Sequence, residues 1–290
     1  MTTEPTGAEI PAYFCRHPGA GFEELMPLPV ALSGWGTEHM RGSAVTGALA
    51  RSAELAGGRR PGLRPVGFTV DLHRAATMAT VSTRSTALRE GGRLMLVDSA
   101  LLQDGCVMAR ARTLFLPTVE QDIDCPPWLP DGTPSTPSDY LQPITGEGSL
   151  FYSDGSGWVP DAGRHRNSER KQFSCLTIPL VADEEVTPFQ AAAAVADLTN
   201  LVTHWGTEGV SHINADVTVV LARTPDGQAM EVSATGRVGA GSPSVSRRDL
   251  RQARRLRIHN SCQPPTARPS GGHGHSAHAR AGDSRQKEEA

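Results

Sequence analysis

Residues 66–74 read VGFTVDLHR, and this stretch alternates apolar and polar side chains with the period of a β-strand that is buried on one face. A helix rich in small residues is predicted before it, at His39–Leu55, and a Gly-Gly pair ends that helix. Short turns then separate three further strands, so the first half of the chain is predicted to be a helix followed by an antiparallel meander. These strands are Ala79–Leu88, Leu94–Leu102 and Val107–Leu116.

The same order of elements returns in the second half of the chain. A Thr-Pro pair at 187–188 is typical of a helix start, and a helix is predicted from there to about His204. The strand Val210–Arg223 then alternates as the first strand does. Arg74 and Arg223 close the two matching strands 149 positions apart (223 − 74), which is about half of the chain and indicates a duplicated domain.

The repeats predict two domains joined by a long surface crossing. We expect an N-terminal repeat over residues 10–116, a connector over 117–167 and a C-terminal repeat over 168–264, with a disordered tail over 265–290. The connector is rich in Pro and Gly and has no clear period. The strand pattern is lost after about residue 239, so the second repeat is expected to be incomplete at its C-terminus.

The composition excludes several classes of protein. A chain of 290 residues with 38% hydrophobic content and a formal net charge of -3 is globular and gives no reason to expect a nucleic-acid partner. No apolar run approaches the ~18 residues of a membrane span and no leader is evident, so we expect no membrane span and a cytoplasmic location.

The five cysteines contain no CxxC pair, and His273, His275 and His278 lie in a loose Gly/His segment. Neither a metal nor another cofactor is expected.

A long central helix wrapped by an antiparallel sheet, present twice, is the layout of a double hotdog, an α+β fold. Four motifs resemble the thioesterase-like proteins of the acyl-CoA thioesterase II group. The resemblance implies hydrolysis of an acyl-CoA thioester to a carboxylic acid and free CoA, without a metal or a covalent nucleophile. It also implies a homo-oligomer formed through the hotdog sheets. The motifs are WGTEHMRGSAVTGALARSAE (35–54), FTVDLHRAA (68–76), AAAVADLTNLVTHWG (192–206) and HINADVTVVLAR (212–223).

Asp197 is the carboxylate on the second predicted helix. The resemblance implies that an Asp at this place orients and activates the water that attacks the thioester carbonyl. From the residues alone, an acid on a buried helix loses solvation, and its pKa is expected to rise toward a useful range for a base. An alternative stays open, because Gln190, Asp197 and His204 fall on one line of the helix and fit the solvated stripe of an amphipathic helix equally well.

Asn214 stands at the strand position where better-known members of the group carry Thr, and its amide can hold a water or a carbonyl. His39 lies at the start of the first predicted helix, where backbone N–H groups near Gly42 and Ser43 can bind a substrate carbonyl or phosphate. The alternative is that His39 is only an ordinary residue at a helix entrance. The complete predicted site has Asp197 and Asn214 as catalytic residues and His39, Met40, Gly42, Ser43, Trp205 and Gly206 as substrate-binding residues.

After Val238 the sequence becomes basic, Pro-rich and aperiodic, where the first repeat predicts two more strands. Codons permitted for Asp249–Pro264, read one nucleotide later, can all be chosen to give IYDKHGVFGYTTVASL, which is a strand, a turn and a strand. This hairpin resembles the closing hairpin of the family and begins 148 positions after Leu101 (249 − 101). We hypothesise that an insertion or deletion, in the gene or in its reading, has put this segment out of frame.

Three functions fit these observations. The first is hydrolysis of acyl-CoA by an Asp-activated water. The second is binding of acyl-CoA without efficient hydrolysis, because the shifted reading has Ala and Ser where better-known thioesterases bring a Gln to the catalytic water. The third is an enoyl-CoA hydratase or dehydratase, which requires a His/Asp pair in a hydratase loop that the sequence does not show. A Ser/His/Asp triad is excluded because no GxSxG elbow supports it.

Overall fold

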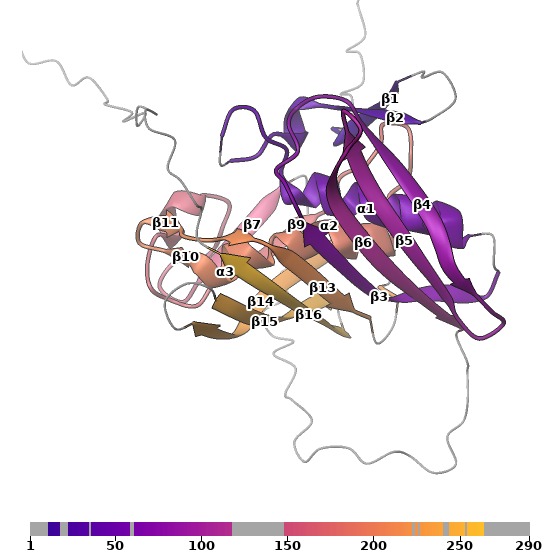
Figure 1. The fold of residues 1–290 in the computed structure, drawn as a ribbon. Helices are drawn as coiled ribbons and strands as arrows, with labels where there is room; N and C mark the ends of the chain where they lie inside the picture. The colour runs from indigo at the N-terminus through magenta and orange to yellow at the C-terminus, as the bar shows by residue number, and fades with distance from the viewer. Residues whose placement is uncertain are drawn as a thin grey trace, which may run out of the picture.

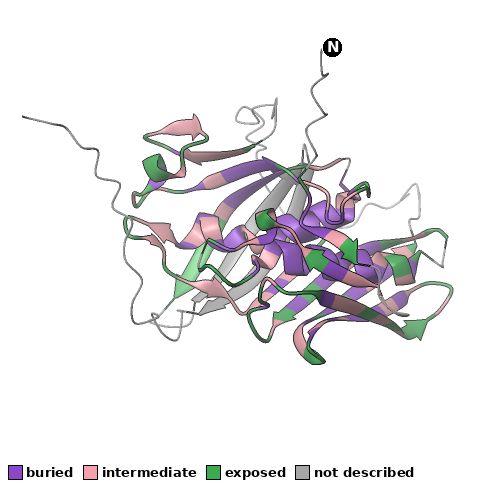
Figure 2. Ribbon diagram, turned by 90° about the horizontal axis from the view of Figure 1, so that it is seen from above, coloured by how far each residue is buried: buried purple, intermediate pink, exposed green. Residues whose placement is uncertain are grey.

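The two predicted central helices lie next to each other, and a strongly curved antiparallel sheet wraps around them (Figure 1). Buried residues are concentrated on the helices and on alternate residues of the strands, so the core lies between helices and sheet (Figure 2). No described helix is long and apolar enough to cross a membrane. The computed structural model describes residues 11–17, 23–34, 36–58, 61–117, 148–221, 224–225, 227–239, 244–252 and 254–263.

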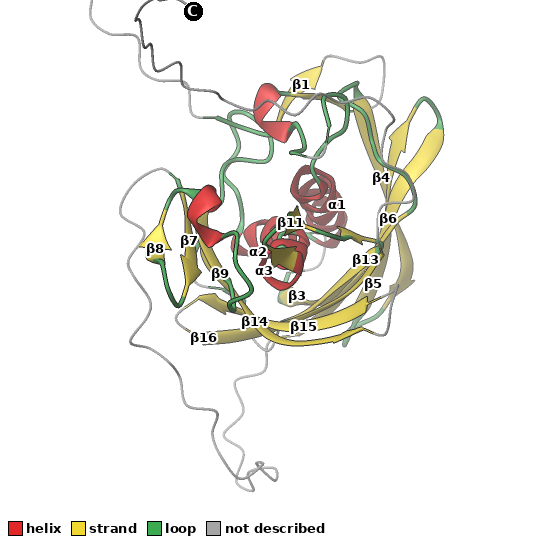
Figure 3. Ribbon diagram, turned by 90° about the vertical axis from the view of Figure 1, so that its left-hand side faces the viewer, coloured by secondary structure: helices red, strands yellow, loops and turns green. Residues whose placement is uncertain are grey.

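The helices at the centre carry mostly small side chains. Helix α1 (Gly42–Gly57) packs against helix α2 (Pro188–Asp197), and α3 (Thr199–His204) continues from α2 after a short break. A Cβ atom at Gly47 would lie 2.4 Å from the side chain of Leu180. Small residues therefore let the second repeat approach the backbone of α1 closely, as the end-on view in Figure 3 shows.

The strands of the first repeat form one half of the large sheet. Their order is β1-β2-β4-β5-β6-β3, and every neighbouring pair is antiparallel. The predicted strands are confirmed, with ends within three residues of the predicted ones. A short 3-10 helix, η1 (Pro29–Ala31), leads to α1. The bounds are β1 (Phe14–His17), β2 (Glu24–Pro27), β3 (Leu63–Leu72), β4 (Val81–Glu90), β5 (Met95–Gln103) and β6 (Cys106–Pro117).

The second half of the sheet repeats this order. It runs β13-β16-β15-β14-β9-β7-β8, and β12 pairs with β16. The predicted strand over 210–223 is divided among β11, β12 and β13 rather than continuous. A separate two-stranded sheet joins β10 (Trp205–Gly206) to β11 (Gly209–Val210). The other bounds are β7 (Ser149–Ser153), β8 (Gly157–Val159), β9 (Gln172–Leu176), β12 (Ile213–Asn214), β13 (Asp216–Val220), β14 (Ala229–Gly239), β15 (Ser244–Gln252) and β16 (Arg254–Gln263).

The two halves meet where β3 pairs with β13. Thr69 lies opposite Thr218, their hydroxyl oxygens are 3.3 Å apart, and these residues are separated by 149 positions, the spacing of the sequence repeat. The same spacing added to the bounds of β5 gives those of β15. The duplicated architecture predicted from the sequence is therefore confirmed, while the domain limits at 10, 116, 168 and 264 stay predictions.

Two predictions about the connecting and closing segments need correction. The second repeat is not incomplete after residue 239, because β15 and β16 pair with each other and close the sheet between β14 and β13. Every residue except proline has a backbone N–H and C=O that can join a ladder, so these two strands pair although their Arg-rich sequences show no strand period. Residues 148–167 of the expected connector contain β7, β8 and the 3-10 helix η3 (Ala162–His165). Residues 118–147 and 265–290 lie outside the described part of the chain.

Strand β15 begins and ends 149 positions after β5, and β16 begins 148 positions after β6 (254 − 106), although their amino-acid sequences differ in character. A change of reading frame has this effect, because it preserves the number of residues and replaces their chemistry. We therefore expect resequencing of the genomic DNA to reveal an inserted or deleted nucleotide before the codon of Asp249. An uninterrupted frame, together with an intact mass that matches the present sequence, would contradict this expectation.

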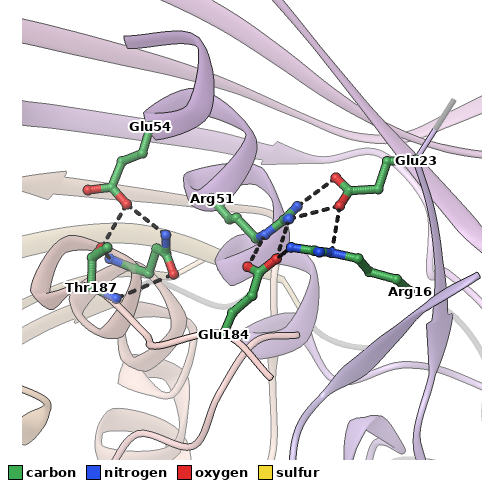
Figure 4. A network of polar contacts seen from close by, with 7 residues as sticks. Arg16, Glu23, Arg51, Glu54, Glu184 and Thr187 are labelled. Atoms are coloured by element: carbon green, nitrogen blue, oxygen red, sulfur yellow. Dashed lines mark hydrogen bonds and ion pairs between the residues drawn. The ribbon is translucent and has the colours of Figure 1, made fainter. Parts of the chain in front are cut away.

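Helix α2 begins at the cap that the sequence predicts. Thr187 Oγ1 accepts a hydrogen bond from the backbone N–H of Gln190 at 3.1 Å, and Pro188 occupies the first turn. The carboxylate of Glu54, from the end of α1, accepts from the Thr187 hydroxyl at 2.7 Å and from the Gln190 amide at 2.8 Å (Figure 4). Burial raises the pKa of Glu54 in spite of these two donors. The contact fixes the end of α1 to the start of α2.

Candidate functional site

Asp197 is the last residue of α2, and its carboxylate lies against the start of α1 in the other repeat. A Cβ atom at Gly42 would lie 2.1 Å from Asp197 Oδ1, so the carboxylate occupies the space that a side chain would fill. Arg41, the N-cap residue of α1, provides no side-chain cap, and the backbone N–H of Ser43 donates to the Asp197 carboxylate instead. Asp197 therefore caps α1 from the opposite repeat and faces the positive end of its dipole.

Asn214 holds the same carboxylate from the sheet. Its amide nitrogen donates to Asp197 Oδ1 at 2.9 Å and to the Asp197 carbonyl oxygen at 2.7 Å. Asn214 ends β12, whose register pairs it with Cys262 of β16. The structure thus brings together four of the predicted site residues, namely Asp197, Asn214, Gly42 and Ser43.

The surroundings of Asp197 disfavour its charged form. Burial raises the pKa of this carboxyl, and the hydrogen bonds from Asn214 and Ser43 and the charge of Arg41 oppose that rise only in part. The pKa is therefore above its ordinary value, in the direction that makes a carboxylate a stronger base. This agrees with the expectation from the sequence.

The solvated-stripe interpretation of the helix is wrong. Gln190 and His204, which lie in line with Asp197, are only 7% and 3% exposed. Gln190 is occupied in the α2 cap, and the ring of His204 stacks on that of His212 with centroids 4.5 Å apart. Two members of the line are therefore buried and Asp197 is half-buried, because the sheet and α1 together enclose most of the second helix.

The remaining predicted binding residues lie in two different places. Met40 is buried just before α1, where its backbone N–H donates to Ala76 O at 2.7 Å, and the neighbouring His39 is exposed. Trp205 and Gly206 lie beyond the other end of α3, beside an open pocket of about 660 Å³. Neither Asp197 nor Gly42 lines that pocket, so Trp205 and Gly206 are not brought to the predicted catalytic pair.

Two residues near Asp197 were not found by sequence reasoning. Arg41 donates from Nε and Nη2 to the carbonyl oxygen of Leu32 at 3.0 and 2.8 Å, and its charge acts on Asp197. Tyr13, from the segment before β1, is buried with its hydroxyl near Ser43 and Asp197. Neither residue belongs to a periodic pattern that marks it. Among the described residues, no group of three or more His, Cys, Asp or Glu side chains could hold a metal ion.

The enclosed helices and the duplicated sheet define an α+β double hotdog, and solved structures agree with this class of fold. No family model matches the chain, and no curated protein is similar to it in sequence. A candidate thioesterase II from Thermobifida fusca aligns with 89% of this chain and 100% of its own, with a TM-score of 0.58 and 16% identity. A tesB protein from Mycobacterium avium subspecies paratuberculosis aligns with 86% of this chain and 95% of its own, with a TM-score of 0.56 and 16% identity.

A protein of unknown function with a hot dog fold, from Alicyclobacillus acidocaldarius, aligns with 86% of this chain and 96% of its own, with a TM-score of 0.58 and 12% identity. At these identities the likeness establishes the fold. The predicted resemblance to the acyl-CoA thioesterase II group is therefore confirmed for the architecture of the chain.

Gly42→Ala tests the close contact at the start of α1. The new methyl group would overlap the Asp197 carboxylate, whose oxygen lies 2.1 Å from the Cβ position, so the carboxylate must move and α1 loses its cap. We expect a loss of roughly 1–3 kcal/mol in the free energy of unfolding, the usual cost of overpacking. Urea denaturation measures it, with Gly206→Ala as control because nothing lies within 4 Å of its Cβ position. An unchanged unfolding midpoint in Gly42→Ala would contradict the packing described.

Proposed function

We propose that this chain hydrolyses acyl-CoA thioesters to a free carboxylic acid and CoA, with Asp197 as the base that activates water. The observation that carries the proposal is the half-buried Asp197 carboxylate, held by the Asn214 amide at 2.9 Å and placed at the start of α1. The fold supports it, because structures with the same architecture include proteins named as thioesterase II and tesB.

In the proposed reaction Asp197 accepts a proton from a water molecule as the water oxygen attacks the thioester carbonyl. The carbon–sulfur bond then breaks, the thiolate of CoA leaves and takes up the proton, and the acyl group leaves as a carboxylic acid. Asn214 fixes the carboxylate in this role. The N–H groups at the start of α1 provide a positive potential for the negative charge that develops on the carbonyl oxygen.

A second candidate is an acyl-CoA-binding protein that does not hydrolyse its ligand. The observation in its favour is that Asp197 already caps α1, which is a sufficient structural reason for a carboxylate there. In that case the carboxylate would be retained for stability, and no water would be activated. The hydratase alternative has no such observation in its favour.

Release of free thiol from a panel of short to long acyl-CoAs by the purified chain tests the proposal. We expect turnover of at least one chain length above the rate in buffer. Binding of acyl-CoA, measured by calorimetry, without turnover would support the acyl-CoA-binding candidate. Hydration of crotonyl-CoA would support the hydratase alternative. A folded protein that neither binds nor hydrolyses any member of the panel would contradict the proposed function.

A further inference from the structure

The Ser43 hydroxyl is a buried polar group at the start of α1. Ser43 is 1% exposed, and within the described residues its Oγ atom makes no hydrogen bond of normal geometry, although the Tyr13 hydroxyl is close enough to act on it. A buried hydroxyl whose hydrogen bonds are not completed lowers the stability of the fold, so its presence needs a reason. The N–H of the same residue donates to the Asp197 carboxylate, which places this hydroxyl next to the candidate base.

The side chain of Tyr13, from the segment before β1, lies near Ser43. Both backbone polar groups of Tyr13 are hydrogen-bonded, because its N–H donates to Pro179 O at 3.0 Å and its carbonyl oxygen accepts from Leu28 N–H at 2.8 Å. The side chain is buried, and its hydroxyl faces Ser43. Burial raises the pKa of Tyr13, so the phenol keeps its proton at neutral pH and can donate a hydrogen bond.

We propose that the Ser43 and Tyr13 hydroxyls bind the carbonyl oxygen of the substrate opposite Asp197. Ser43 donates its hydrogen bond to the carbonyl oxygen, which makes it a catalytic residue. In the substrate complex Tyr13 donates to Ser43 Oγ and orients that hydroxyl, which makes it a positioning residue. No bond forms between the protein and the acyl group. This inference rests on the proposed function and deepens it, since it assigns two side-chain hydroxyl groups to recognition of the acyl carbonyl.

Two non-hydrolysable probes separate recognition of the carbonyl from binding of the rest of the ligand. One is a ketone analogue of butyryl-CoA, in which a methylene group separates the sulfur from the carbonyl. The other is S-butyl-CoA, which has no carbonyl. Calorimetry is performed on the full chain and on Ser43→Ala and Tyr13→Phe. Ser52→Ala is the matched control, because Ser52 lies on the same helix and its Oγ is 2.7 Å from Ser85 Oγ, away from the site.

We expect the unaltered chain and Ser52→Ala to bind the ketone analogue about tenfold more tightly than S-butyl-CoA, as one to two hydrogen bonds allow. Both site variants should lose this preference while keeping their affinity for S-butyl-CoA. The kcat of Ser43→Ala should fall roughly a hundredfold, as for loss of one donor to a developing oxyanion.

Other results overturn the inference in distinguishable ways. A carbonyl preference that survives in both site variants overturns the inference and leaves the proposed function intact. An equal loss of affinity for both probes shows a merely structural role for the hydroxyls and also overturns it. An unaltered chain that binds neither probe and releases no thiol overturns the proposed function and the inference together.

Discussion

Asp197→Asn is expected to lower kcat for thioester hydrolysis by about a hundredfold or more, the usual contribution of a positioned general base. The amide has nearly the shape of the carboxyl, so the amide oxygen of the variant can still accept the hydrogen bond from Ser43 N–H and the fold should persist. What the variant loses is the ability to take a proton from water. Thiol release at saturating acyl-CoA measures the effect, and equal turnover by the variant would show that Asp197 is only a helix cap.

The pH dependence gives a second test of the same carboxyl. Its pKa is raised, and a base works in its deprotonated form, so kcat should fall as the pH drops below that raised pKa. The effect on stability has the opposite sign. A carboxyl whose pKa is higher in the folded than in the unfolded state stabilises the fold at a pH below its unfolded pKa. This stabilisation is lost as the pH rises through the folded pKa. Asp197→Asn should remove the contribution of this carboxyl to the pH dependence of kcat and of stability. Asp154→Asn, in an exposed turn after β7, is the control and should show the same two pH dependences as the unaltered chain.

Local patterns were sufficient to predict most of the fold. Alternation found the strands of the first repeat, and the Thr-Pro pair at 187–188 located the start of α2, because caps and strand faces depend on neighbouring residues. The break after Asp197 was not predicted, since the helix pattern continues to His204. Strands β15 and β16 were not predicted either, because their place in the sheet depends on distant backbone partners and not on their own period.

The candidate site was predicted only in part, and mainly through the resemblance. Periodicity placed Asp197 on a line with two other polar residues and could not decide whether that line faces water. The approach of Gly42 to Asp197 depends on how two helices from different repeats pack, and no local signal encodes it. Tyr13 and Arg41 were missed for the same reason, because their proximity to Asp197 is produced by the tertiary fold.

A four-residue ion-pair network fixes the outer side of α1 to segments from both repeats (Figure 4). Arg51 of α1 is only 3% exposed and donates two hydrogen bonds of 2.8 Å to Glu23, which precedes β2. It also donates to Glu184, which precedes α2, at 2.6 and 2.7 Å. Arg16 of β1 contacts both carboxylates from the outside. Two positive and two negative groups therefore balance at a junction in which Arg51 is buried and the other three side chains reach the solvent.

Arg51→Met is expected to lower the free energy of unfolding by roughly 1–3 kcal/mol, the usual effect of removing a buried donor to charged groups, because the carboxylates left behind are partly exposed and still contact Arg16. The methionine fills the space of the side-chain stem but leaves Glu23 and Glu184 without their main donor. Arg51→Lys should recover only part of the loss, because an ammonium group cannot bind two carboxylates with the fork geometry of a guanidinium. Urea denaturation with a linear extrapolation measures all three proteins.

The sign of the pH effect distinguishes this network from ordinary packing. The guanidinium of Arg51 holds the pKa of Glu23 below its usual value, so this carboxylate stabilises the fold above its unfolded pKa and loses that contribution as the pH falls through the lowered pKa. Arg51→Met should therefore be less sensitive to acid than the unaltered chain, although it is less stable at neutral pH. Arg64→Met is the matched control, because Arg64 is exposed and bonds only its neighbour's carbonyl among the described contacts. A loss in Arg51→Met no larger than in this control would show that the ion-pair network does not hold the two repeats together.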